Sequence, residues 1–202
     1  MPGRYNPVTM KDVVGILALQ GDFAKHADAV ARAGAEHVLV RRPRDLERAS
    51  RLIIPGGEST TFALLLEQEN LRGMIVERAK AGMPVFGTCA GSILVAREVD
   101  GNHSSVRVKP LGLIDARVSR NAYGRQVDSF EDSVDVTLGG KSLRVPAVFI
   151  RAPKFTEMGA GVEVIGTRAG EPVMLRQGKV VISAFHPELT DDLTIHRFFL
   201  SL

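Results

Sequence analysis

The chain has 202 residues, of which 45% are hydrophobic and 24% are charged, as expected of a single globular domain that buries its own core. Its net charge of +3 is too small to indicate nucleic-acid binding, and the most basic segment, residues 41–51, contains no aromatic side chain for base stacking. No apolar run approaches the roughly 20 residues that span a bilayer, and a single cysteine cannot form an internal disulfide, so a reducing cytoplasm is the expected location.

The N-terminal half alternates strand and helix signals. Residues 1–12 have no apolar segment and are expected to be a polar tail, which leaves residues 13–202 as one domain. Residues 13–19 form an apolar run, the pattern of a strand buried on both faces of a parallel sheet. Further strands are expected at residues 37–40, 52–54 and 83–86, and helices at residues 22–33, 60–67, 71–81 and 92–97.

After about residue 105 the pattern changes to short extended segments. Turns at Gly139-Gly140 and Gln177-Gly178 indicate hairpins, so part of this region is expected to be antiparallel. The strands are expected at residues 113–120, 133–138, 147–150, 162–167, 172–176 and 180–184, and a last helix at residues 190–200. Alternating βα units followed by extra strands predict an α/β fold, a three-layer α/β/α sandwich with a mixed, mostly parallel central sheet.

The cysteine, Cys89, follows a buried strand and lies in the small-residue turn Gly87-Thr88-Cys89-Ala90-Gly91. A sharp strand-to-helix turn of this kind exposes a nucleophile, and the N–H of Ala90 then faces the group that the sulfur attacks. A lone cysteine is more often a small core residue. The flanking glycines favour the catalytic interpretation here.

A base for that thiol is found near the end of the chain, in the segment Phe185-His186-Pro187-Glu188. Residues two apart in an extended segment point the same way, so Glu188 is expected to hydrogen-bond the far nitrogen of His186. Cysteine, histidine and an orienting carboxylate form the arrangement that activates a nucleophile.

The segment Pro55-Gly56-Gly57 follows the third expected strand. The N–H of Gly57 is placed to join that of Ala90 in an oxyanion hole. The alternative is an ordinary turn in which Ser59 or Thr60 caps the next helix. The glycine spacing and the lysine of a phosphate-binding loop are missing.

The remaining polar candidates are less specific. Arg120 and Arg151 each follow an apolar strand, and either could bind a substrate at the sheet edge or lie on the surface. The other histidines have no partner at a recognisable spacing and are expected to be structural or solvent-facing: His26, His37, His103 and His196. No set of residues has the spacing of a metal site.

Taken together, these segments resemble the class I glutamine amidotransferase family, whose flavodoxin-like glutaminase domains use a Cys-His-Glu triad. The resemblance runs from about Val13 to the last helix. It is closer to the branch of the family that supplies ammonia for pyridoxal 5'-phosphate (vitamin B6) synthesis, and this closer match is carried by residues 19–22, 55–61, 120–130, 149–153 and 185–189.

The resemblance implies that Cys89 is the nucleophile, His186 the general base and acid, and Glu188 its orienting group. It places glutamine contacts at Gly57, Glu58, Ser59, Arg120, Ile150 and Arg151. Gln20 would lie near a partner interface and order the oxyanion loop. The family needs no cofactor, and its partner is a synthase subunit with a (β/α)₈ barrel that receives the ammonia.

Three alternatives remain open at this point. The chain could be a glutaminase serving histidine or purine synthesis. It could be a cysteine hydrolase or chaperone-like protein that acts alone on a similar sandwich. A non-catalytic regulatory subunit is also conceivable, although the intact triad argues against it.

Overall fold

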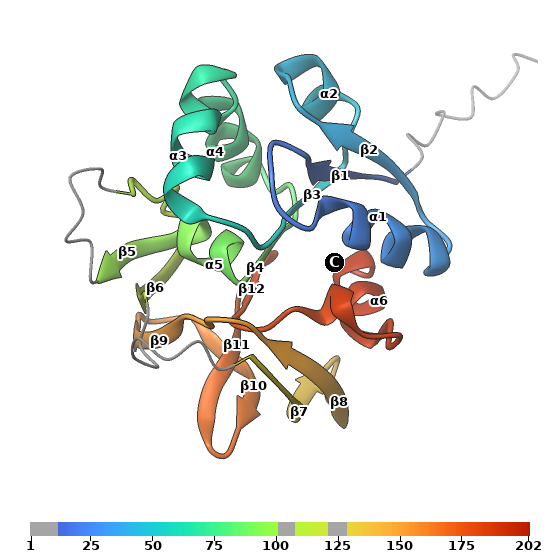
Figure 1. The fold of residues 1–202 in the computed structure, drawn as a ribbon, viewed down its shortest axis with the longest axis vertical. Coiled ribbons are helices and arrows are strands. Elements are labelled where there is room, and N and C mark those ends of the chain that lie inside the picture. The colour runs from blue at the N-terminus through green and yellow to red at the C-terminus, as the bar shows by residue number, and fades with distance from the viewer. Residues whose placement is uncertain (1–11, 101–107, 121–128) are drawn as a thin grey trace, which may run out of the picture.

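The computed structural model describes residues 12–100, 108–120 and 129–202, and its centre is a nine-stranded sheet in the order β2-β1-β3-β4-β12-β11-β10-β7-β8 (Figure 1). The first five of these strands are parallel to one another. They are β2 (Glu36–Val40), β1 (Val13–Leu17), β3 (Arg51–Ile54), β4 (Val85–Thr88) and β12 (Val180–Ser183). Every residue of β3, β4 and β12 is buried, which explains their continuous apolar sequences.

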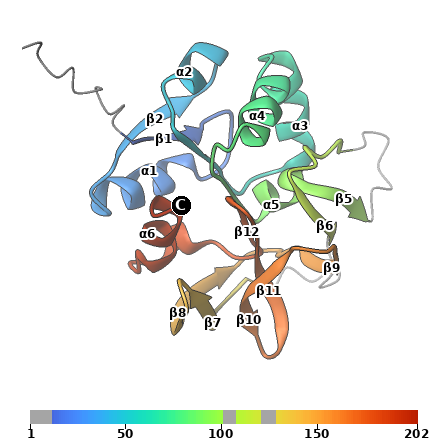
Figure 2. The same cartoon turned by 180° about the vertical axis from the view of Figure 1, so that it is seen from behind.

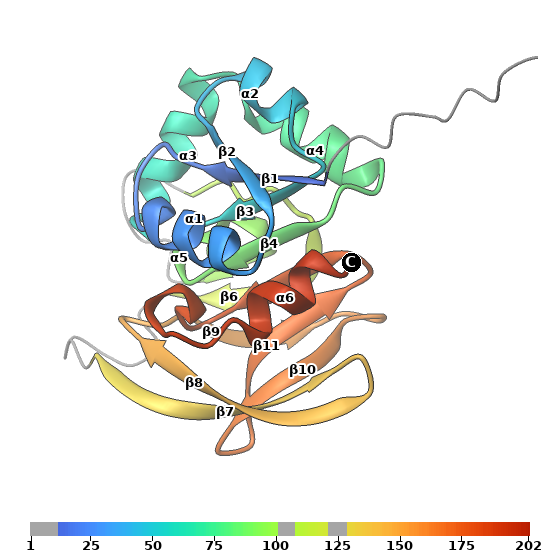
Figure 3. The same ribbon diagram turned by 90° about the vertical axis from the view of Figure 1, so that its right-hand side faces the viewer.

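The other four strands extend the sheet in antiparallel fashion. They are β11 (Glu171–Gln177), β10 (Glu163–Arg168), β7 (Phe130–Leu138) and β8 (Lys141–Phe149). The expected hairpins at residues 139–140 and 177–178 join β7 to β8 and β11 to β12. The hairpin of β7 and β8 forms the end of the molecule opposite β2 (Figure 3). The predicted mixed sheet is therefore confirmed.

Helices cover both sides of the parallel strands (Figures 1 and 2). Helices α1 (Phe23–Arg32) and α6 (Thr194–Leu200) lie on one side, and α3 (Ser59–Gln68), α4 (Arg72–Lys80) and α5 (Ala90–Val95) lie on the other. None of the helices in the described part of the chain combines the length and the apolar character needed to cross a bilayer.

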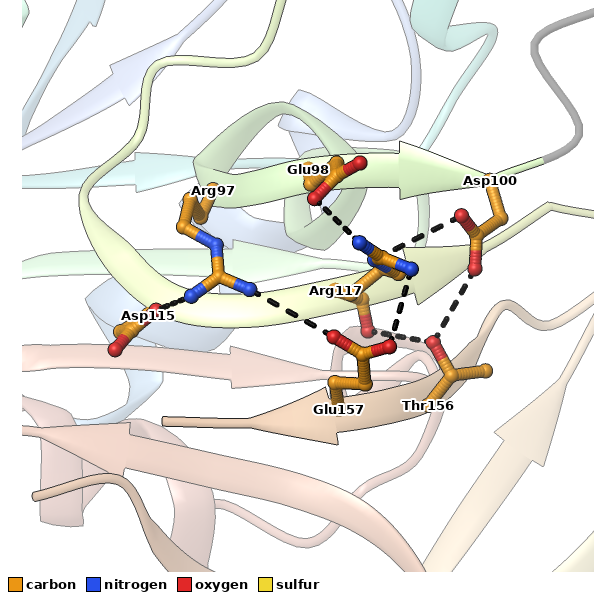
Figure 4. A network of polar contacts seen from close by, with 7 residues as sticks. All are labelled: Arg97, Glu98, Asp100, Asp115, Arg117, Thr156 and Glu157. Atoms are coloured by element: carbon orange, nitrogen blue, oxygen red, sulfur yellow. Dashed lines mark hydrogen bonds and ion pairs between the residues drawn. The ribbon is translucent and has the colours of Figure 1, made fainter. Parts of the chain in front are cut away.

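A second sheet of three strands, β5 (Ala96–Asp100), β6 (Ile114–Ser119) and β9 (Lys154–Met158), packs beside the main one. A polar network crosses it (Figure 4). Arg117 on β6 lies 2.8 Å from Glu98 on β5 and 3.0 Å from Glu157 on β9, so one guanidinium links all three strands. This sheet matters for the site because β6 ends next to Arg120.

Several elements differ from the sequence-based expectations. The helix expected at residues 92–97 begins at Ala90 and ends at Val95, and the chain continues as β5. The basic segment contains the short helix α2 (Pro43–Glu47), with a proline in its first turn, where the sequence indicated no helix. Strand β9 was also missed, because Lys154–Met158 alternates too weakly to be recognised.

Candidate active site

Cys89 lies at the sharp turn between β4 and α5, with φ 48° and ψ −108°. A positive φ is strained for any residue other than glycine, and such strain gathers at functional sites. The N–H of Cys89 donates to the carbonyl of Ser183 on β12 at 2.9 Å, which fixes the turn to the neighbouring strand. The residue is buried, with 8% of its surface exposed.

Close packing around this turn requires glycine at position 91. A Cβ added there would lie 2.0 Å from the carbonyl oxygen of Ile54, at the end of β3. The first turn of α5 therefore rests directly on the neighbouring strand. The N–H of Ala90 belongs to that first turn and has no acceptor within its own helix.

His186 and Glu188 follow β12, and His186 Nδ1 lies 2.7 Å from Glu188 Oε1. The contact was predicted, but its geometry was not: Pro187–Leu189 form a 3₁₀ helix, η1, rather than an extended segment. The N–H of His186 donates to the carbonyl of Val148 on β8 at 2.8 Å, which holds the turn against the antiparallel part of the sheet. The side chains of both residues are buried.

The protonation of this pair is set by opposing effects. Burial by itself would lower the pKa of His186, but hydrogen bonds to Cys89 and Glu188, together with their negative charges, raise it to about 10. Burial likewise opposes the ionised form of Glu188, but the imidazoles of His26 and His186 hold its pKa below the ordinary value. The arrangement therefore favours a protonated His186 beside an ionised Glu188.

A pocket of about 230 Å³ opens over the cysteine. This size suits a small molecule rather than a polymer. Nine of the candidate residues line it: Gly57, Glu58, Ser59, Cys89, Ala90, Arg120, Ile150, Arg151 and His186. Three further residues line the pocket without having been assigned a role from the sequence, namely Asp22, Ile93 and Pro153, although Asp22 and Pro153 lie in segments that carry the family resemblance.

The wall formed by α3 and the end of β6 is charged. The Glu58 carboxylate accepts hydrogen bonds from the N–H groups of Thr60 and Thr61 at 3.0 and 2.7 Å, so Glu58 is the N-cap of α3. The alternative in which Ser59 or Thr60 caps this helix is therefore excluded. Burial would raise the pKa of Glu58, but these hydrogen bonds lower it. Arg120 Nη2 lies 3.4 Å from the same carboxylate.

Gln20 holds the loop that carries Gly57. Its Nε2 donates to the carbonyl of Glu58 at 2.6 Å, and its Oε1 accepts from the N–H of Glu58 at 3.2 Å. Gly56 in this loop lies so close to the His186 ring that an added Cβ would come within 2.4 Å of it. Gln20 thus holds the loop beside the His186 imidazole without lining the pocket itself.

Two histidines that were expected to be structural or solvent-facing lie directly behind the site. His26 on α1 and His196 on α6 are fully buried, and His26 Nε2 is 3.3 Å from Glu188 Oε2. No spacing in the sequence connects residue 26 with residue 188. His37 is exposed, and His103 lies outside the described residues, as do residues 121–128 of the segment that the sequence singled out.

One group in the described part of the chain has the composition of a cation site, namely Asp22, His186 and Glu188, whose ligand atoms lie within 4.8 Å of one another. Two of its three members already make the 2.7 Å hydrogen bond described above. A cation held there would compete with that bond for the same atoms, so this group is better explained by the His186–Glu188 pair.

Known proteins were compared with this chain at the levels of family, sequence and structure. The model of the SNO glutamine amidotransferase family matches residues 16–202. A protein of Pelotomaculum thermopropionicum named pyridoxal 5'-phosphate synthase subunit PdxT is 53% identical over 188 residues, which is 93% of each chain. A protein of the same name from Thermus thermophilus is 49% identical and covers 96% of this chain and 98% of its own.

Solved structures agree with these matches. A crystal structure of a glutamine amidotransferase superposes with a TM-score of 0.84 at 47% identity, covering 93% of this chain and 97% of its own. The structure of PurLQS from Thermotoga maritima, at 14% identity and a TM-score of 0.73, shares the fold alone. The class is thereby defined as the glutamine amidotransferases, which confirms the expected fold and enzyme class. Within this class, the chain belongs to the SNO glutamine amidotransferase family.

Proposed function

We propose that this chain is the glutaminase subunit of a pyridoxal 5'-phosphate synthase and hydrolyses L-glutamine to L-glutamate and ammonia. The observation that carries the proposal is the meeting of Cys89 and His186 in one pocket, with Glu188 bonded to the far nitrogen of the imidazole. The matched relatives, which are named subunits of that synthase, support the same substrate and product.

The first step is attack by the sulfur of Cys89 on the carboxamide carbon of glutamine. His186 faces the sulfur as an imidazolium. As the S–C bond forms, the carbonyl π electrons move to oxygen, and the N–H groups of Gly57 and Ala90 stabilise the resulting oxyanion. The Ile150 carbonyl, 3.7 Å from the sulfur, is placed to accept a hydrogen bond from the carboxamide nitrogen.

His186 then donates its proton to the departing nitrogen, so that ammonia leaves and a Cys89 thioester remains. Neutral His186 next removes a proton from water, which attacks the thioester and releases glutamate. Glu188 remains ionised throughout and stabilises the imidazolium when it forms. His186 thus acts as the general acid in the first half of the reaction and as the general base in the second.

The charged wall of the pocket is suited to the amino-acid end of glutamine. Arg120 and Arg151 are the cations available to its carboxylate, and Glu58 is the anion available to its ammonium group. Ser59 adds a hydroxyl on the same side. A substrate held at this wall extends its carboxamide toward Cys89.

The ammonia requires a recipient. We propose a synthase subunit with a (β/α)₈ barrel that docks beside Gln20, because Gln20 holds the backbone of the oxyanion loop and is reachable from outside. Docking would then order the Gly57 loop and raise turnover. A cytoplasmic complex suits a working thiol.

The test is ammonia release from glutamine, measured with and without a candidate synthase subunit and repeated with Cys89→Ala. The proposal requires turnover that depends on the partner and disappears in the alanine variant. Activation by a subunit of histidine or purine synthesis, and not by the pyridoxal phosphate synthase, would move the chain to that other branch. Hydrolysis of other substrates without any partner would favour the lone cysteine hydrolase.

A further inference from the structure

A buried chain of imidazoles lies behind Glu188 and has no part in the mechanism above. His26 Nε2 is 3.3 Å from Glu188 Oε2, and both side chains are 0% exposed. His26 Nδ1 is 3.1 Å from His196 Nε2. Glu188 Oε2 has no hydrogen-bonding partner of good geometry among the described residues, so His26 is the group that faces it.

The hydrogen positions in this cluster follow from the acceptors. An anionic carboxylate oxygen in a dry site disfavours a lone pair opposite it, so Nε2 of His26 carries the proton. Nδ1 of His26 must then accept, and His196 Nε2 supplies the donor. The remaining lone pair falls on His196 Nδ1, the one atom of that ring without a partner in the described structure.

We propose that His26 is a positioning residue: its neutral imidazole holds Glu188 in the orientation that His186 needs, while His196 fixes the tautomer of His26. This inference rests on the proposed function. Because the His26 ring stays neutral, its Nε2 faces Glu188 Oε2 at 3.3 Å without cancelling the negative charge of that carboxylate. A lysine or arginine in its place would pair with that charge and weaken the stabilisation of His186.

The surroundings support a neutral ring. Burial lowers the pKa of His26. Burial and the neighbouring His26 lower the pKa of His196 to about 3. The charged and titratable groups that act on the two rings come from α1, η1 and the loops beside them, and they are Asp22, Arg32, His186, Glu188 and Asp192.

Thr88 offers a competing explanation, because its hydroxyl lies 3.1 Å from the same His26 Nε2. If His26 served only to hold Thr88 and the turn before Cys89, loss of the hydroxyl would be as harmful as loss of the imidazole. The two roles are separable by substitution.

The test uses four variants of the full chain in complex with its synthase subunit. His26→Leu removes both ring nitrogens, whereas His26→Gln places an amide near Nε2 and His26→Asn places one near Nδ1 only. Thr88→Val removes the competing hydroxyl and keeps the shape. Each variant is assayed for kcat and KM with glutamine, and the His186 imidazole is titrated by NMR.

We expect His26→Leu and His26→Asn to lower kcat by about 10- to 100-fold, the factor for leaving a buried carboxylate oxygen without the polar group that faces it. KM should change by less than about 3-fold, and the pKa of His186 should fall. His26→Gln should restore both quantities, and Thr88→Val should resemble the parent. Should His26→Leu fail to fold, the comparison of the polar pair His26→Asn and His26→Gln decides.

Parent-like kcat and His186 titration in folded His26→Leu or His26→Asn would overturn the inference, as would equal damage from Thr88→Val. Equal impairment of His26→Gln and His26→Asn would do the same. Cys89→Ala in the same assay distinguishes failure of the proposed function from failure of the role given to His26. If it retains activity, the proposed function fails; if it is inactive while His26→Asn is parent-like, only the role of His26 fails.

Discussion

Two carboxylates of the site are built in opposite ways: Glu58 lines the pocket, and Glu188 lies behind His186. The Glu188 side chain is 0% exposed and lies between two imidazoles. The Glu58 side chain is 53% exposed, caps a helix and pairs with Arg120. A buried anion cannot relax around a new partner, whereas an exposed one can. The buried side of the site, around Glu188, is therefore the rigid side, and the exposed side, around Glu58, is the adjustable side.

Substitution of Cys89, at the centre of the rigid side, should have the largest effect. Cys89→Ala should lower glutamine turnover by about 10⁴-fold or more, because no other group at the turn can form the thioester. Ammonia release in the complex is the measurement, and circular dichroism checks that the fold is kept. Cys89→Ser, which retains the geometry with a poorer nucleophile, should be nearly as inactive. Substantial turnover in the alanine variant would exclude Cys89 as the nucleophile.

The same substitution at the two carboxylates tests the comparison directly. Glu188→Gln should lower kcat by about 10²- to 10⁴-fold, because a neutral amide cannot stabilise the imidazolium of His186. Glu58→Gln should change kcat by less than about 10-fold and act mainly on KM, since it leaves the triad intact. Steady-state kinetics of the two variants decides. Similar losses in kcat would show that the two sides are not functionally distinct.

The pKa of His186 should depend on its contacts with Cys89 and Glu188. The pKa of His186, about 10, lies above the ordinary 6.5. The contribution of the protonated ring to the stability of the folded protein is therefore complete below about pH 6.5 and is lost as the pH rises through 10. NMR titration of the ring should show this raised pKa in the parent. Cys89→Ala and Glu188→Gln should each lower it, because each removes an anion from the ring. A parent-like titration in both variants would contradict the assigned contacts.

On the adjustable side, Arg120→Ala should raise KM for glutamine by about 10-fold with a smaller change in kcat, because it removes a cation available to the substrate carboxylate. Arg120→Lys keeps the charge and is the matched control, which should recover part of the affinity. A change confined to kcat would indicate that Arg120 acts on the chemical step.

The smallest expected effect belongs to Gln20. Gln20→Ala removes both hydrogen bonds to the Glu58 backbone, so activation by the synthase subunit should weaken several-fold. Alkylation of Cys89 by a small electrophile should continue, because the thiol itself is not disturbed. If the free chain and the complex turned over equally at saturating glutamine, the proposed activation would be wrong.

The parts of the fold that were predictable from sequence are those with strong local signals. The buried strands β3, β4 and β12 consist of apolar runs, and the turns around Cys89 and Gly57 carry their own glycines. Strands β5 and β9 gave no such signal, because Arg97, Glu98 and Glu157 place charges on the exposed face of the small sheet. Their pairing depends on contacts with β6, which sequence patterns do not reveal.

The contacts of the candidate site likewise divide into those that the sequence predicts and those that it does not. His186 and Glu188 are two positions apart, so their contact was predictable even though the 3₁₀ turn was not. His26 and Glu188 are brought together only by packing of α1 against η1, and Asp22 reaches the pocket from the loop before α1. Contacts between residues this far apart in the sequence cannot be predicted from the spacing of residues in a motif.

The position of β12 has a consequence for how the molecule is made. This strand lies between β4 and β11 in the middle of the sheet, yet it is the last strand along the chain. His186, Glu188 and His196 all follow it. During synthesis, a ribosome-bound chain that already displays Cys89 therefore lacks the groups that activate it. The enzyme stays silent until its central strand is inserted, and the many distant pairings that this requires predict slow folding.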